Sequence, residues 1–474
     1  MDQTVIFDLD GTLADTRKVS GPALKRIAQA SGLAEPTDTV IAAAIGVSGD
    51  DFYRLVYPDA APEALSELAD RVFAQEKLIA VALGKDLLFD GAEALLDALS
   101  NAGCRLAIAS TGEEAHVESV LRVTGLTGRF ETIVCGHNDK TAMLADILKR
   151  HGIAPASAVM VGDKPKDSGA ASDNGLPSVG AGWGFSTADE LTGFTLTAQT
   201  PTDAIAAITL LQTVSACIES PRNRIPKDAA LLPELAGQRI YEFPLFGVAD
   251  SRDDAFAVLK QPGVIGPHVL SPLEWQPDAA SVISMFFPFT EAVRKSNRRP
   301  QLPSEAWLHG RYEGQETLNA ILRDAAGALE AVGFSALVPS SDARYAAPGV
   351  PPFSSRWSER HVAYACGLGT FGLSHGLITK RGMAGRFGSL LTTAALRPVA
   401  RTYTDITEWC TRCGACIARC PVQAITPAGK QHPPCSDFLD DTRARHAPRY
   451  GCGKCQTAVP CESGRPLRGA PATS

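Results

Sequence analysis

Residues 4–12 read Thr4-Val5-Ile6-Phe7-Asp8-Leu9-Asp10-Gly11-Thr12, an apolar run that ends in two aspartates and a Gly-Thr turn. The residues before Asp8 are β-branched or aromatic, which predicts a buried strand. Side chains alternate along a strand, so Asp8 and Asp10 point to the same side and reach one centre. The stretch therefore predicts a strand with a pair of carboxylates at its C-terminal end.

Further short apolar runs follow this one and alternate with amphipathic segments. They lie at residues 105–109, 132–134, 158–161 and 177–179. Such alternation predicts an α/β fold with a parallel sheet and helices on both faces. Between the first two runs, residues of about 16–88 carry helical patterns. An insertion there would lie over the carboxyl ends of the strands as a helical cap.

The paired aspartates suit phosphoryl transfer. Asp8 can attack phosphorus, while Asp10 protonates the leaving oxygen and later activates water against the aspartyl phosphate. A divalent cation is needed because two carboxylates otherwise repel a phosphate dianion. The remaining parts occur in order along the chain. Ser110 ends the second run, Lys140 precedes a helix, and Gly162-Asp163-Lys164-Pro165-Lys166-Asp167 follows the fourth run.

These four motifs resemble those of the haloacid-dehalogenase-like phosphatases over roughly residues 1–200. The resemblance implies a Rossmann-like core, Mg²⁺ and a small phosphorylated metabolite as substrate. Asp10 favours phosphate ester hydrolysis, since the dehalogenase branch lacks it, and the helical insertion resembles the phosphoglycolate phosphatase group. The implied catalytic residues are Asp8, Asp10, Ser110 and Lys140, and the implied metal residues are Asp8, Asp10, Asp163 and Asp167.

Eight of the twelve cysteines lie in the last 65 residues. Four of them form the run Cys410-x2-Cys413-x2-Cys416-x3-Cys420, followed by Pro421. Structural zinc sites use paired C-x2-C elements, but they have no use for a third cysteine at this spacing followed by x3-Cys-Pro. The run is typical of cubane iron–sulfur clusters.

Two cubane clusters need eight thiolates, and in two-cluster ferredoxins the fourth cysteine of such a run ligates the other cluster. By that crossing pattern, the first cluster is expected on Cys410, Cys413, Cys416 and Cys461, and the second on Cys420, Cys435, Cys452 and Cys455. The four scattered cysteines, 104, 135, 217 and 366, are expected to be core residues. This distribution of the cysteines indicates a protein of the reducing cytoplasm and not one held together by disulfides.

Three parts of the second half resemble the epoxyqueuosine reductase family. They are the segment 358–372, which contains Gly367-Leu368-Gly369, residues 388–393 and the clustered cysteines. The likeness covers about residues 220–463 and implies a nitroreductase-like α+β layer, a two-cluster ferredoxin-like end and a cobalamin. Glu359 matches a family glutamate, but Phe353 stands where the catalytic aspartate is expected, which argues against epoxide reduction. The glycines satisfy G-x-G-x-x-G, yet they follow a helical pattern, so no dinucleotide site is indicated.

Charge divides the chain unevenly. Residues 1–219 contain 16 Lys and Arg against 30 Asp and Glu, and the rest contain 29 against 22. This asymmetry supports a boundary near residue 220. We expect a phosphatase domain at 1–215, an α+β reductase-like domain at 220–400 and a two-cluster domain at 401–474. The modest basic excess is compatible with tRNA without indicating it.

The start of the chain has no signal-peptide pattern, and no apolar run approaches 18 residues, so we expect a cytoplasmic protein without membrane association. The function expected first is a bifunctional fusion of a phosphate-monoester hydrolase with an iron–sulfur electron-transfer or reductase module served by a redox partner. The alternative is an iron–sulfur oxidoreductase, with or without a corrinoid, whose first domain only regulates or binds substrate. A third reading makes the second half a passive electron carrier.

Overall fold

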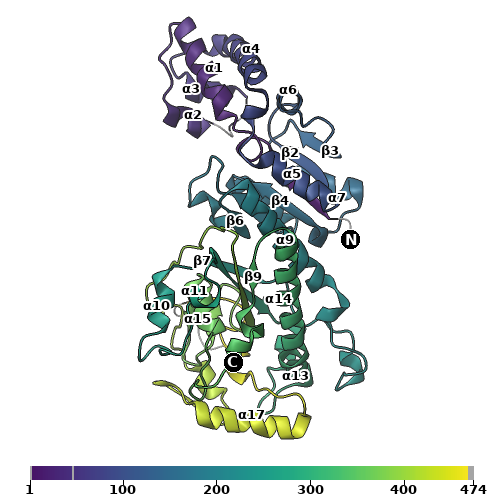
Figure 1. The fold of residues 1–474 in the computed structure, drawn as a ribbon, viewed down its shortest axis with the longest axis vertical. Helices are drawn as coiled ribbons and strands as arrows, with labels where there is room; N and C mark the ends of the chain where they lie inside the picture. The colour runs from purple at the N-terminus through teal and green to yellow at the C-terminus, as the bar shows by residue number, and fades with distance from the viewer. Residues whose placement is uncertain (1–2, 45–46, 48, 468–474) are drawn as a thin grey trace. The chain divides into compact units, whose positions relative to one another are not determined.

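The computed structural model describes residues 3–44, 47 and 49–467. The chain divides into two compact units, Met1–Gln212 and Thr213–Ser474 (Figure 1). Helix α9 (Pro201–Glu219) crosses the boundary between them.

A six-stranded parallel sheet forms the centre of the first unit. Its order is β3-β2-β1-β4-β5-β6. The strands are β1 (Thr4–Phe7), β2 (Arg105–Ser110), β3 (Thr132–Cys135), β4 (Ala158–Gly162), β5 (Ser178–Ala181) and β6 (Leu196–Ala198). The predicted Rossmann-like α/β fold is confirmed, and each of the five predicted runs overlaps a strand. The order reverses between β1 and β4, which is where open parallel sheets bind ligands.

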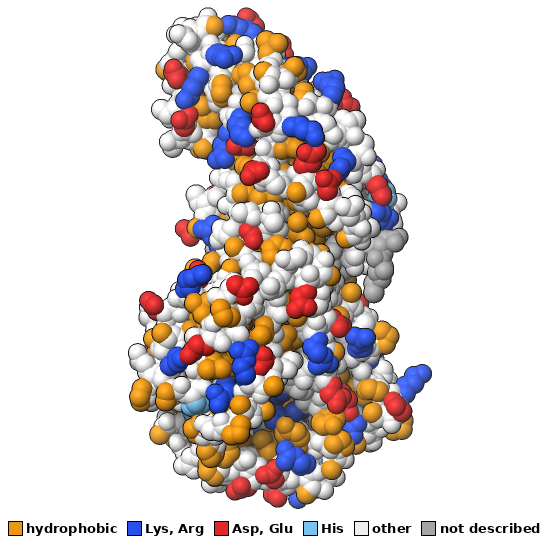
Figure 2. Space-filling view, viewed as in Figure 1, with side chains coloured by type: hydrophobic (Ala, Val, Ile, Leu, Met, Phe, Trp, Pro, Cys, Tyr) orange, Lys and Arg blue, Asp and Glu red, His pale blue; other side chains and the backbone are white. Residues whose placement is uncertain are grey.

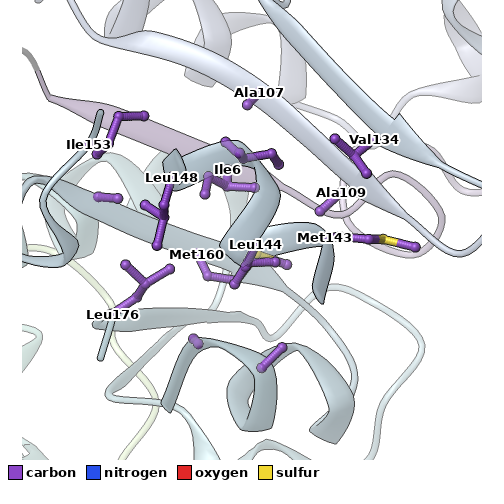
Figure 3. Close-up of a cluster of buried hydrophobic side chains, with 14 residues drawn as sticks. Ile6, Ala107, Ala109, Val134, Met143, Leu144, Leu148, Ile153, Met160 and Leu176 are labelled. Carbon is purple, nitrogen blue, oxygen red and sulfur yellow. The ribbon is translucent and has the colours of Figure 1, made fainter. Parts of the chain in front are cut away.

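Helices α5 (Ala92–Asn101), α6 (Glu114–Val123), α7 (Lys140–His151) and α8 (Pro165–Asp173) connect the strands. Figure 3 shows Ile6 of β1 and Met160 of β4 among side chains of α7, including Met143 and Leu144. All four side chains are fully buried. Burying each such side chain contributes roughly 1.5–3 kcal/mol, so this core fixes the strand ends that carry the aspartates.

The segment expected to form a cap is helical. It contains α1 (Arg17–Ala30), α2 (Asp38–Ala44), α3 (Asp50–Val56) and α4 (Leu65–Leu83). Leu24 of α1 and Val72 of α4 belong to a separate apolar cluster. The hydroxyl of Tyr57 donates a hydrogen bond to the Leu24 carbonyl oxygen at 2.7 Å. The insertion therefore has its own small core.

The second unit mixes helices with a four-stranded antiparallel sheet of order β7-β8-β12-β9. These strands are Leu245–Asp250, Ser281–Pro288, Gly385–Thr392 and Ala336–Leu337. Helices α14 (Glu313–Ala331) and α15 (Glu359–Ala365) contact β12. A hairpin of β10 (Gly369–Phe371) and β11 (Leu377–Thr379) follows α15.

The other elements of this unit are short. They are α10 (Asp254–Leu259), α11 (Pro272–Trp275), α12 (Glu291–Ser296), α13 (Glu305–Arg311), α16 (Ala415–Ala418), β13 (Ile425–Thr426), β14 (Gly429–Lys430) and α17 (His432–His446). Most of the eight clustered cysteines therefore lie on loops and short helices.

Helix α9 is long and apolar enough to cross a membrane by length and composition. Since 61% of its apolar window is buried, and buried core helices pass the same test, this is weak evidence for a span. On the face drawn in Figure 2, basic and acidic side chains are interspersed rather than gathered by sign.

Candidate functional site

Three buried aspartates meet at the carboxyl ends of β1 and β4. One oxygen each of Asp8, Asp163 and Asp167 lies within 4.8 Å of the others. Lys140, the first residue of α7, places its Nζ 2.9 Å from Oδ1 of Asp8 and 2.6 Å from Oδ1 of Asp167. Asp8, Lys140 and the Asp163/Asp167 pair come from three separate parts of the chain, and the fold brings them to one point.

Three carboxyl groups in this cluster face a single ammonium group, that of Lys140. Burial above all, and the charges of Asp167 and Asp163, raise the pKa of Asp8 to about 7 against the opposing effect of Lys140. Burial, followed by the charge of Asp167, raises the pKa of Asp163 to about 6. Asp163 accepts the Phe185 N–H at 2.9 Å through Oδ2, while its buried Oδ1 has no hydrogen-bond partner. A divalent cation held by carboxylate oxygens fits this donor set.

Two glycines allow the aspartates to approach. Gly11 has a φ of +79°, and a Cβ there would lie 2.7 Å from Oδ2 of Asp163. A Cβ on Gly162 would lie 2.4 Å from the carboxylate of Asp167. Only glycine fits at these positions without displacing a carboxylate.

Asp10 has a different partner. Its Oδ1 lies 2.9 Å from Nε2 of His116, near the start of α6. Burial acts to raise the pKa of Asp10, but the charge and hydrogen bond of His116 outweigh it and the pKa is lowered. Burial acts to lower the pKa of His116, yet Asp10 raises it to about 9. Sequence reasoning grouped Asp10 with the metal residues and missed His116, whose only signal was its place in the helix after Ser110.

Ser110 ends β2 and is buried, and its Oγ accepts the N–H of Gly112 at 3.1 Å. Beside it, Nζ of Lys166 donates to Oγ1 of Thr111 at 3.0 Å. A cavity of about 360 Å³ adjoins these groups. Its lining includes Asp8, Asp10, Gly112, His116 and Lys166 on the core side and Tyr53, Phe73 and Glu76 on the cap side. No motif in the sequence indicated these three cap residues.

The clustered cysteines of the second unit are free thiols that fall into two groups. Cys410, Cys413, Cys416 and Cys461 line one small cavity of about 20 Å³. In the other group, burial first raises the pKa of Cys452, and the neighbouring charges of Cys455 and Cys435 raise it further. Cys455 is likewise influenced by Cys435 and Cys420. Helix α15 and the hairpin around Gly369 exclude a strand-turn-helix dinucleotide motif here.

Comparison with known proteins identifies two regions. Residues 5–181 match the model of the haloacid dehalogenase-like hydrolases, and residues 403–426 match a 4Fe-4S binding domain. The chain is 31% identical over 194 residues to the tyrosine-protein kinase PtkA of Mycobacterium tuberculosis, covering 40% of this chain and 64% of that relative. It therefore spans less than two thirds of the first curated relatives' length.

A second relative is covered more fully. The phosphoglycolate phosphatase of Agrobacterium fabrum is 32% identical over 190 residues, which cover 38% of this chain and 80% of that protein. Among solved structures, CbbY from Rhodobacter sphaeroides in complex with phosphate has 22% identity and a TM-score of 0.37, with coverage of 42% of this chain and 95% of that one.

Proposed function

Since the chain belongs, through residues 5–181, to the haloacid dehalogenase-like hydrolases, we propose that its first unit is a magnesium-dependent phosphatase of small phosphate monoesters. The observation that carries the proposal is the meeting of Asp8, Asp163 and Asp167 around Nζ of Lys140 at the switch point of the sheet. A nucleophile, a cation site and a fixed positive charge are thereby adjacent.

In the proposed reaction, an oxygen of Asp8 attacks phosphorus and the bond to the leaving oxygen breaks. Asp10, which receives a proton from the protonated His116 in contact with it, donates that proton to the leaving oxygen, then accepts one from water as the water attacks the aspartyl phosphate. Phosphate leaves and the Asp8 carboxylate is restored. Lys140 and the backbone N–H groups beside Ser110 neutralise phosphate charge, and Mg²⁺, held by Asp8, Asp163 and Asp167, would supply further charge stabilisation.

Replacement of Asp163 by Asn tests the metal site. We expect the Mg²⁺ concentration for half-maximal hydrolysis of p-nitrophenyl phosphate to rise by at least about tenfold, because the buried anionic Oδ1 is lost. Dialysis against EDTA should abolish wild-type hydrolysis, and added Mg²⁺ should restore it. Full activity after chelation, with no residual metal, would contradict the magnesium dependence.

Replacement of His116 by Gln tests the Asp10 contact. Because His116 holds the carboxylate that transfers the proton, we expect kcat to fall by about a hundredfold with a smaller change in KM. The matched control is Glu113→Gln, which changes charge immediately before α6 and in the same cavity lining. Equal losses in both variants would argue against a specific role for His116.

For the second unit, we infer an electron-transfer or reductase module with two [4Fe-4S] clusters. The match at residues 403–426 supports an iron–sulfur domain. The division of the clustered cysteines into two sets supports the assignment of four cysteines to each cluster. A reducing cytoplasm and an external redox partner suit this chemistry. The interspersed surface charges give no separate support for a tRNA partner.

Cobalamin is not part of the proposal. Phe353, at the position of the catalytic aspartate in the epoxyqueuosine reductases, is 62% exposed and packs against His432. The cavity beside Glu359 measures about 370 Å³, within the range of small-molecule sites.

A further inference from the structure

The cavity beside Glu359 is lined by three arginines from different elements. They are Arg311 at the end of α13, Arg360 in α15 and Arg386 in β12. Its volume of about 370 Å³ lies in the range of small-molecule sites. None of the residues assigned to phosphate hydrolysis belongs to this unit, and the cluster cysteines do not line the cavity.

Throughout the described residues 3–44, 47 and 49–467, no carboxylate oxygen forms an ion pair with any of the three guanidinium groups. Arg386 donates to Oε1 of Gln315, and Arg360 donates to the His375 carbonyl oxygen at 3.0 Å. The guanidinium of Arg311 lies over the Tyr450 ring, 4.5 Å from its centroid, and its buried Nε has no hydrogen-bond partner. None of these direct contacts is with a carboxylate.

The charges in this cavity repel one another. Burial, together with the positive charges of Arg311 and Arg360, lowers the pKa of Arg386 to about 10. Burial acts to raise the pKa of Tyr450, but the charges of Arg311 and Arg386 outweigh it and the pKa is lowered. Partly buried like charges without counter-ions are costly, and an anion would relieve that cost.

Glu359, which also lines the cavity, is bonded to a serine and not to one of these arginines. Burial raises its pKa to about 7, and its Oε2 accepts a hydrogen bond from Ser389 at 2.7 Å. Its other oxygen, Oε1, is buried with no partner. In the protonated form Glu359 is a hydrogen-bond donor, which makes it a second polar group suited to an incoming oxyanion.

We propose that this cavity binds a small organic molecule that carries a carboxylate or phosphate group. The anionic group contacts Arg311 and Arg386, which match planar oxyanions through paired N–H donors. The rest of the molecule lies against apolar and aromatic lining side chains, which include Trp307, Leu377 and Phe387. This assignment adds a ligand site to the proposed electron-transfer or reductase module.

The cavity adjoins both sets of clustered cysteines. Gln456, which follows Cys455 in the chain, lines it, as does Met383, whose Sδ lies 3.8 Å from Sγ of Cys461. Desolvation lowers the pKa of Arg360, while the charges of Cys455 and Cys435 act in the opposite direction. A ligand held here would change the electrostatic surroundings of the clusters, which gives the binding event a spectroscopic signature.

The test uses the full iron-loaded chain under anaerobic conditions, titrated calorimetrically with 1-naphthoate and 1-naphthylphosphonate. The phosphonate cannot be hydrolysed, and neutral 1-naphthalenemethanol reports apolar binding alone. We expect at least one anion to bind at least tenfold more tightly than the alcohol. Arg311→Gln and Arg386→Gln should each weaken that binding by at least tenfold, and Arg386→Lys should recover part of it. Exposed Arg323 supplies the control Arg323→Gln, which should bind as the wild type does.

Two further measurements keep the result decisive. Iron content and the magnetic resonance spectrum of the reduced clusters are recorded for each variant with and without the probe. A ligand-dependent change that vanishes in Arg386→Gln at full iron content supports the site. If Arg386→Gln loses iron, Arg311→Gln replaces it in this comparison. Equal affinity for both anions and the alcohol, binding that survives both substitutions, or a corrinoid extracted from the purified chain would overturn the proposal.

Discussion

Replacing Asp8 by Asn is expected to reduce hydrolysis of p-nitrophenyl phosphate by at least about a thousandfold, because the amide cannot form the aspartyl phosphate. The substitution keeps the shape of a side chain that is 5% exposed, so the fold around β1 should persist. Steady-state rates with saturating Mg²⁺, measured beside the melting temperature of each variant, provide the check. A folded variant that retains substantial turnover would remove Asp8 as the nucleophile.

The matched control is Asp97→Asn. Asp97 pairs with Arg129 at the surface of the same unit, its side chain is 53% exposed, and it does not line the cavity, so its variant should hydrolyse at the wild-type rate. The decisive contrary result concerns the wild type itself. Absence of turnover with every phosphate ester, despite bound Mg²⁺, would favour the reading in which the first unit only binds or regulates.

The aspartate centre was predictable because each of its residues lies beside a recognisable strand or helix end. Asp8 follows β1, and Asp163 follows β4, and parallel strands in this order bring those ends together. Lys140 begins α7, so the same reasoning reached it. The order of the motifs along the chain is enough to predict that these residues meet, because the rules for connecting parallel strands allow only a few topologies.

His116 was not predictable in the same way. Its contact with Asp10 spans 106 positions, and it depends on the rotation of α6 about its own axis. The cap residues of the cavity, including Tyr53 and Phe73, were equally hard to predict from the sequence. An apolar residue on an amphipathic helix can belong to a core as readily as to a substrate site.

The arginine cavity is the feature that the sequence predicts least well. Arg311, Arg360 and Arg386 are separated by 49 and 26 positions, and no motif joins them. A single arginine in a sequence is most often a solvated surface residue. Only the packing of α15 and α14 against β12, with α13 packed on α14, brings the guanidinium groups to one cavity.

The cysteines occupy an intermediate position, because their spacing predicts cluster chemistry while their grouping requires the fold. Two assignments compete: a local one, in which Cys410, Cys413, Cys416 and Cys420 hold one cluster, and the crossed one, in which Cys461 replaces Cys420. The small cavity that Cys461 shares with the first three favours the crossed assignment. Single substitutions do not separate the two, since each removes one ligand from one cluster.

Double substitutions separate them, and the expected effect is large. Wild-type protein should hold about eight irons per chain under anaerobic conditions, as two cubanes. Under the crossed assignment, Cys416→Ala with Cys461→Ala damages one cluster and leaves about four irons, whereas Cys416→Ala with Cys420→Ala damages both and leaves almost none. The local assignment reverses the two outcomes. Cys217→Ala, which removes a thiol near Asp324, should keep all the iron. Zinc in place of iron in the wild type would refute both assignments, because it would replace cluster chemistry with a structural metal site.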